Sequence, residues 1–137
     1  MNRILLDTSA YSAHLYSHAD VRGAIQRASE IGFSAVSIGE LRAGFLKGGR
    51  SRRNEELLAS FLASPRVRIL AVDEETASRY AAIHDHLRRQ GTPVPTNDIW
   101  IAATAAQYGL RLVTLDQHFL DVPQIAVDFI ESVGPGR

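Results

Sequence analysis

Ile4-Leu5-Leu6-Asp7-Thr8-Ser9 is a short apolar run that ends in a carboxylate and two hydroxyls, and a similar order returns at Leu112-Val113-Thr114-Leu115-Asp116. Continuous apolar runs of this length are typical of strands that are buried on both faces of a parallel sheet. In such sheets, ligands bind outside the carboxyl ends of the strands. We therefore expect Asp7 and Asp116 to lie on the same edge of one sheet.

Short strands alternate with helices along the rest of the chain. Apolar runs predict strands at residues 3–6, 33–36, 67–71, 112–115 and 125–129. Helical spacing predicts one helix after a cap at Thr8 or Ser9, one from about residue 20 to a stop at Gly32, and others at 37–47, 54–63, 73–90 and 97–108. This alternation is typical of an α/β protein whose parallel sheet has helices on both faces.

The chain of 137 residues has the length of one domain. We expect a single domain over residues 1–130 and a flexible tail at 131–137. Its 15 basic and 15 acidic residues cancel, so no overall field directs it toward nucleic acid or an anionic membrane. Any such affinity must come from a local patch or a bound cation.

The absence of cysteine excludes a disulfide scaffold, thiolate catalysis and cysteine-type metal sites. The apolar run before Asp7 is too short for a signal peptide, and no run approaches the ~20 residues of a membrane span. We therefore expect a cytoplasmic protein that does not enter the membrane.

Four acids stand at the boundaries of predicted elements: Asp7, Glu40, Asp98 and Asp116. Each has an ordinary structural explanation. Asp7 can cap the first helix, Glu40 can close a capping box with Ser37, Asp98 suits the positive end of a helix dipole, and Asp116 can open a turn. On one edge of the sheet, however, the four together would repel one another.

A divalent cation would remove this repulsion. Oxygen donors without cysteine or clustered histidine indicate Mg²⁺ or Mn²⁺ rather than zinc, and such sites serve mainly phosphate chemistry. Nearby hydroxyls and an amide are candidates for orienting the acids or holding bound water: Thr8, Ser9, Asn97 and Thr114. Thr8 and Ser9 can equally serve only as helix caps.

A basic run of Lys47, Arg50, Arg52 and Arg53 lies near the middle of the chain, at a predicted flexible connector. These side chains, and Arg42 in the preceding predicted helix, are candidates for contacting an RNA backbone or a protein partner. A charged connector is more often simply solvated. His118, two residues after Asp116, could lie near the site, although a histidine in a turn more often has no catalytic part.

The ordered set of acidic motifs resembles the PIN domain, specifically the VapC-type toxin ribonucleases of bacterial type II toxin–antitoxin pairs. The resemblance covers about residues 1 to 130. Single motifs are weak, but the ordered set is specific. The motifs are Leu5-Leu6-Asp7-Thr8-Ser9, Ser37-Ile38-Gly39-Glu40-Leu41-Arg42-Ala43-Gly44, Thr96-Asn97-Asp98-Ile99-Trp100-Ile101-Ala102-Ala103 and Val113-Thr114-Leu115-Asp116.

This resemblance implies a three-layer α/β/α sandwich around a mainly parallel five-stranded sheet, and Mg²⁺- or Mn²⁺-dependent endonucleolytic cleavage of RNA by an activated water. It implies that Asp7 and Asp98 are the principal metal ligands, that Glu40 and Asp116 bind directly or through water, and that Thr114 supports the site. It also implies a homodimer that is silenced by a VapB-type antitoxin.

Other functions fit the sequence less well. A phosphotransfer receiver needs a pair of acids after the first strand and a late lysine, and the last lysine here is Lys47. A haloacid-dehalogenase-type phosphatase needs Asp-x-Asp where this chain has Asp7-Thr8-Ser9, and there is no Gly-x-Ser-x-Gly elbow for a serine hydrolase. The remaining alternative is a catalytically idle PIN-like module that binds RNA or protein.

Overall fold

A computed structural model describes residues 2–131 of the chain. One sheet with the strand order β3-β2-β1-β4-β5 forms its centre, and all four strand pairs are parallel. This confirms the predicted five-stranded parallel sheet. The predicted tail at 131–137 lies, apart from Glu131, outside the described residues. The strands are Arg3–Leu6 (β1), Glu30–Ser34 (β2), Val67–Leu70 (β3), Arg111–Thr114 (β4) and Val127–Phe129 (β5).

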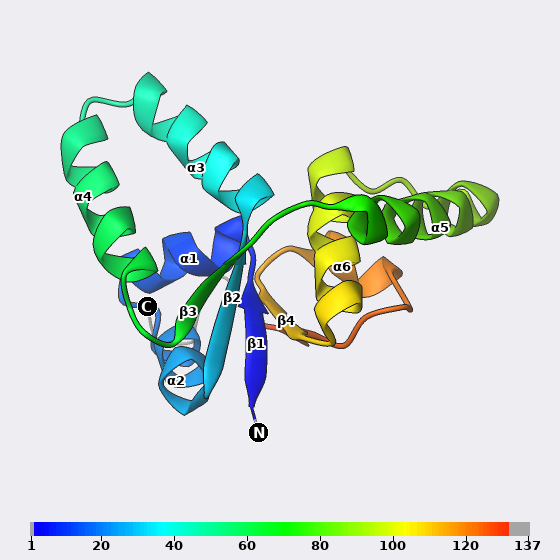
Figure 1. Cartoon of the computed structure of the whole chain (residues 1–137), viewed down its shortest axis with the longest axis horizontal. Helices are drawn as coiled ribbons and strands as arrows, with labels where there is room; N and C mark the ends of the chain where they lie inside the picture. Colours follow the sequence, from blue (N-terminus) through cyan, green and yellow to red (C-terminus); the bar gives the residue numbers. More distant parts are fainter. Residues whose placement is uncertain (1, 132–137) are drawn as a thin grey trace.

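Helices cover both faces of the sheet (Figure 1). One apolar cluster joins the sheet to α1–α4, and a second joins it to α5, α6 and the short 3-10 helix η1. This arrangement is the predicted three-layer α/β/α sandwich. The helices are Thr8–Leu15 (α1), Ala19–Arg27 (α2), Ala35–Lys47 (α3), Ser51–Leu62 (α4), Glu74–Gln90 (α5), Thr96–Tyr108 (α6) and Gln117–Asp121 (η1).

The opening strand shows why its apolar run is continuous. Ile4 and Leu6 enter the cluster under α1–α4, whereas Leu5 enters the cluster under α5 and α6. All three side chains are at most 1% exposed. A strand that is covered on both faces needs an apolar residue at every position.

Among the predicted boundaries that are wrong, three concern helices, and the second strand spans Glu30–Ser34 rather than residues 33–36. Gly32 does not stop a helix: α2 ends at Arg27, and Gly32 lies inside β2, where an added Cβ would come within 2.8 Å of side-chain atoms of Leu110 and Leu70. Helix α3 begins at Ala35 because the buried Ser34 hydroxyl accepts the amide proton of Val36. The third error concerns the basic connector.

This connector is shorter than predicted, because α4 begins at Ser51 rather than after Asn54. Arg52 and Arg53 therefore occupy the first turn of α4, and only residues 48–50 join α3 to α4. The pair of helices α3 and α4, the α3–α4 arm, extends to one side of the sheet edge, and α5 with α6, the α5–α6 arm, extends to the other (Figure 1). Among residues 2–131, no helix is long and apolar enough to cross a membrane.

Candidate metal centre

Asp7 directly follows β1 and is the N-cap residue of α1. Its Oδ1 accepts hydrogen bonds from the Ala10 amide at 2.8 Å and the Ser9 hydroxyl at 2.7 Å, and its Oδ2 accepts one from the Thr114 hydroxyl at 2.6 Å. The predicted cap at Thr8 or Ser9 is therefore wrong, because Asp7 caps the helix. Asp7 is only 3% exposed, and burial raises its pKa although these hydrogen bonds act to lower it.

Asp116 follows β4, the neighbour of β1. The chain runs from β1 outward to β3 and then returns to β4 on the other side of β1, so the strand order reverses between β1 and β4. Ligands bind at such switch points in open α/β sheets. The buried Thr114 hydroxyl accepts the amide proton of Asp116 at 2.9 Å and so links both strand ends. The expected meeting of Asp7 and Asp116 on one edge is confirmed.

Glu40 reaches this edge from the second turn of α3. Its Oε1 accepts a hydrogen bond from the Thr8 hydroxyl at 2.6 Å, and its Oε2 accepts one from the Asn97 amide at 3.1 Å. The alternative of a capping box with Ser37 is wrong, because α3 already begins at Ala35. Glu40 therefore joins α1, α3 and α6 around one carboxylate.

Asp98 lies in the first turn of α6, as predicted, with its side chain 14% exposed. Burial, followed by the negative charges of Asp116, Asp7 and Glu40, raises the pKa of Asp98 to about 7. Charges of one sign that face each other at short range favour protonation of one member. Asp98 therefore lies where its ionised form is disfavoured unless a positive charge is nearby.

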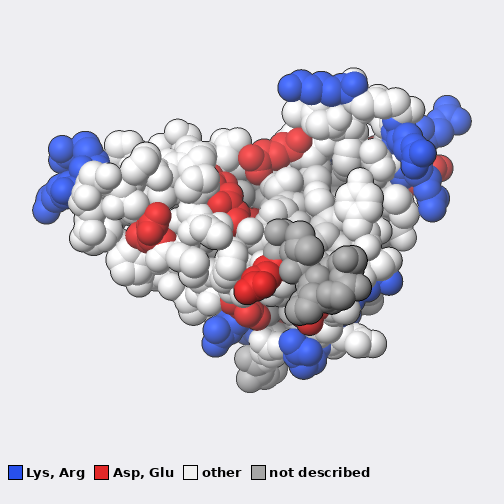
Figure 2. Space-filling model, turned by 180° about the vertical axis from the view of Figure 1, so that it is seen from behind, with Lys and Arg blue, Asp and Glu red and all other residues white. Residues whose placement is uncertain are grey.

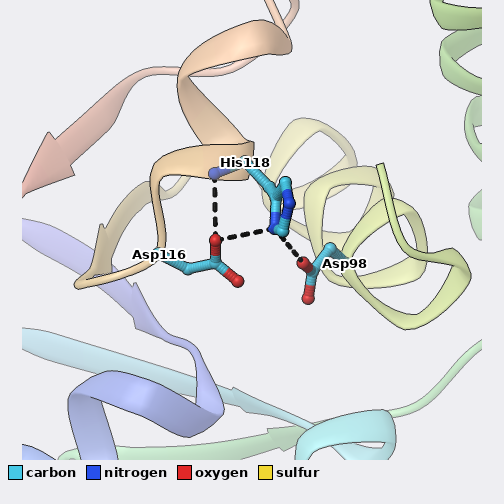
Figure 3. Close-up of side chains that lie close together, drawn as sticks. All are labelled: Asp98, Asp116 and His118. Atoms are coloured by element: carbon cyan, nitrogen blue, oxygen red, sulfur yellow. Dashed lines mark hydrogen bonds and ion pairs between the residues drawn. The ribbon is translucent and has the colours of Figure 1, made fainter. Parts of the chain in front are cut away.

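His118 also reaches this group, which is the less favoured of the two alternatives that its position after Asp116 leaves open. Its Nδ1 lies 2.9 Å from Oδ1 of Asp116 and 3.7 Å from Oδ2 of Asp98, and one ring nitrogen faces both carboxylates in Figure 3. Its position follows from η1, where Asp116 is the N-cap and accepts the backbone N–H of His118. The two-residue separation was the only sequence signal for this contact.

All four predicted acids line one open cavity of about 280 Å³, and Figure 2 shows acidic side chains in the hollow between the two arms. Carboxylate oxygens held by hydroxyl and amide donors are the ligand set of Mg²⁺ or Mn²⁺. Because a cation would also relieve the repulsion at Asp98, the residues present fit a divalent metal. The lining residues are Asp7, Thr8, Ser9, Ser12, Glu40, Asp98, Ile101 and Asp116.

The basic candidates lie apart from this cavity lining. Arg42 forms two hydrogen bonds of 3.0 Å with Glu55 and so joins α3 to α4. The others are exposed at the tip of the α3–α4 arm, and Figure 2 shows basic side chains at the ends of both arms. These tip residues, hereafter the basic tip, are Lys47, Arg50, Arg52 and Arg53.

Comparisons with known proteins agree with this architecture. The chain matches the PIN domain family over residues 4–125. It is 34% identical to ribonuclease VapC4 of Mycobacterium tuberculosis over 72% of this chain and 75% of that protein. It is 33% identical to toxin FitB of Neisseria gonorrhoeae over 90% of this chain and 95% of FitB.

A solved structure shares both fold and sequence with the chain. VapBC-5 of Mycobacterium tuberculosis, described as a member of the VapBC family of toxin–antitoxin systems, superposes with a TM-score of 0.69 at 29% identity. The match covers 93% of this chain and 97% of the other. With the family match spanning most of its length and the acids meeting at the switch point of the sheet, this chain belongs to the PIN domain family.

Proposed function

We propose that this protein is a divalent-metal-dependent endoribonuclease and the toxin of a type II toxin–antitoxin pair. One observation carries the proposal: four acids from four separate segments line the same cavity at the switch point of the sheet. Family membership and the similarity to ribonuclease VapC4 and toxin FitB support RNA as the substrate. The single domain over residues 1–130 is part of this proposal.

The four acids would bind Mg²⁺ or Mn²⁺, with Asp7 and Asp98 as the principal ligands and Glu40 and Asp116 completing the set. When bound, the cation neutralises charge on the scissile phosphate and lowers the pKa of a water nucleophile. Asp7 contributes a carboxylate whose direction is fixed by three hydrogen bonds. A carboxylate held by these bonds would already be oriented as a metal ligand.

The hydroxyl and amide groups have orienting roles in this proposal. Ser9 and Thr114 hold Asp7, and the Thr114 hydroxyl also fixes the backbone that leads into Asp116. Thr8 and Asn97 each donate to one oxygen of Glu40. Such outer groups keep the metal ligands in place, and their removal commonly lowers metal affinity by about 10- to 100-fold.

The basic tip is proposed to contact the RNA backbone at a distance from the cavity. Arg52 and Arg53 lie in the first turn of α4, where the helix dipole disfavours positive charge. An RNA phosphate at this position would compensate both the dipole and the arginines. Arg42 is already paired with Glu55, so its first role is to hold the α3–α4 arm together.

A VapB-type antitoxin is the proposed protein partner, and a homodimer is the proposed assembly, as the family resemblance implies. The cytoplasm is the proposed location of the activity, since the proposed substrate and antitoxin would both be made there. The membership of VapBC-5 in a family of toxin–antitoxin systems supports the partner.

Incubation of the purified protein with total RNA and Mn²⁺ tests the proposal directly. We expect cleavage that EDTA abolishes and that Asp98→Asn reduces to background, whereas Asp121→Asn, which removes an exposed acid of η1, should remain active. A catalytically idle binding module would bind RNA without cutting it. Absence of EDTA-sensitive cleavage would therefore favour that alternative.

A further inference from the structure

His118 is close to two of the proposed metal ligands but has no part in the function proposed above. Its Nδ1 and one oxygen from each of Asp98 and Asp116 all lie within 4.8 Å of one another. The three side chains come from α6, the end of β4 and η1, and they point toward a common centre in Figure 3. The group therefore combines two carboxylates with one imidazole.

The position of the imidazole is fixed by the local backbone. Oδ1 of Asp116 accepts the backbone N–H of His118 at 2.9 Å, which closes the first turn of η1. The same oxygen lies 2.9 Å from Nδ1. Although the side chain is 50% exposed, two contacts to one carboxylate hold its Nδ1 edge toward the acids.

We infer that His118 is a further ligand of the metal centre, whose Nδ1 shifts the preference of the site from Mg²⁺ toward Mn²⁺ and the later divalent metals. This inference rests on the proposed function, because it requires a cation among the acids. At metal–ligand distances of about 2.1 Å, neighbouring ligands of an octahedral ion are about 3 Å apart and opposite ligands are about 4.2 Å apart. The observed 2.9 Å and 3.7 Å fall in this range with little movement.

The predicted preference follows from ligand chemistry. Mg²⁺ is held almost entirely by oxygen and keeps several waters. Imidazole nitrogen suits later first-row metals, whose affinity for mixed nitrogen and oxygen sites rises from Mn²⁺ toward Cu²⁺. Nδ1 lies 2.9 Å from Oδ1 of Asp116. A metal-bound imidazole uses the lone pair of one nitrogen, so a neutral ring that binds through Nδ1 carries its single N–H at Nε2.

The variant His118→Asn distinguishes two roles of His118, as a metal ligand or as a residue that only orients Asp116. The asparagine amide branches at the same carbon as the imidazole and can donate N–H from the place of Nδ1, but it offers a metal only oxygen. His84→Gln is the matched control, because it also replaces a histidine by an amide, and His84 lies on α5 beside Tyr80 and not in the cavity lining. Pulsed electron paramagnetic resonance of bound Mn²⁺, without RNA, detects a directly coordinated ¹⁴N, and titration calorimetry with Mg²⁺, Mn²⁺ and Co²⁺ measures affinity.

We expect ¹⁴N coupling in the wild type and in His84→Gln and its loss in His118→Asn. The affinity of His118→Asn for Mn²⁺ and Co²⁺ should fall by about tenfold, with Mg²⁺ affinity changed by less than about twofold. Bound Mn²⁺ without nitrogen coupling in the wild type would overturn this inference alone. A wild type that binds no Mn²⁺ would overturn the proposed metal centre as well.

Discussion

Replacing Asp98 with asparagine is expected to stabilise the metal-free protein and to remove most of its stabilisation by divalent cations. Burial and neighbouring carboxylates raise the pKa of Asp98 from 3.8 to about 7 in the folded state. The folded state therefore holds this proton more tightly than the unfolded state does. The cost of ionising Asp98 is absent below about pH 4, grows as the pH rises, and is complete above about pH 7.

The expected shift follows from this cost. One pKa unit corresponds to about 1.4 kcal/mol, so the full difference is about 4 kcal/mol, which we halve to about 2 kcal/mol because water partly screens the site. The variant also loses a favourable carboxylate in the first turn of α6, about 0.5 kcal/mol. The net gain at about pH 8 is about 1.5 kcal/mol, or about 5 °C in Tm for a chain of this size.

Thermal unfolding at about pH 5 and about pH 8, in EDTA or in excess Mn²⁺, measures both effects. With Mn²⁺ at about 100 times Kd, the wild type should gain about 2.7 kcal/mol, and Asp98→Asn less than a third of that. Asp121→Asn should follow the wild type throughout. If Asp98→Asn is no more stable than the wild type in EDTA at about pH 8, the repulsion argument fails; an undiminished response to Mn²⁺ would refute the ligand assignment.

Three further sets of substitutions test the hydroxyl support, the basic tip and the core. Thr114→Val should lower Mn²⁺ affinity by about tenfold in calorimetry, whereas Thr114→Ser should retain most of it; equal affinities would refute the orienting role. The double variant Arg52→Ala and Arg53→Ala should bind RNA more weakly in EDTA and reduce the salt slope by about 1 to 2, and an unchanged slope would exclude these phosphate contacts. Leu58→Ala, at a residue with 0% exposure, should cost about 2–5 kcal/mol in chemical unfolding, while Leu46→Ala, at 81% exposure, should stay within about 0.5 kcal/mol.

The sheet and the position of two acids could be predicted because both depend on local sequence. The strands at 3–6 and 112–115 are apolar at nearly every position, which is a signal of burial on both faces. Asp7 and Asp116 each follow such a run directly. In a parallel sheet, residues at equivalent ends meet at one edge, so the pattern alone predicts their proximity.

The remaining errors concern contacts that local sequence does not encode. Helix α3 begins two residues before the predicted start because Ser34, at the end of a buried strand, caps it. This shift moves Glu40 from a capping position to the second turn, facing Thr8 and Asn97. His118 reaches the acids only through the short helix η1, which has no periodic signal.

Arg42 is an example of a contact between two helices that cannot be predicted from local sequence. Arg42 is expected, like the basic tip, to contact RNA or a protein partner. In the structure it pairs with Glu55, which is 13 residues away on the next helix. This pairing depends on how α3 and α4 lie relative to each other, which local sequence does not indicate.

The metal centre combines two acids at the sheet edge, Asp7 and Asp116, with acids that are carried by the two arms. Asp7 is part of the sheet edge, 3% exposed and held by three hydrogen bonds. Glu40 belongs to the α3–α4 arm and Asp98 to the α5–α6 arm, so the shape of the cavity depends on how both arms lie against the sheet. A cation bound by Asp7, Glu40 and Asp98 would hold the two arms to the end of β1. Because Asp7 is the only one of the three that neither arm carries, the strand that ends in it provides the reference point for the others.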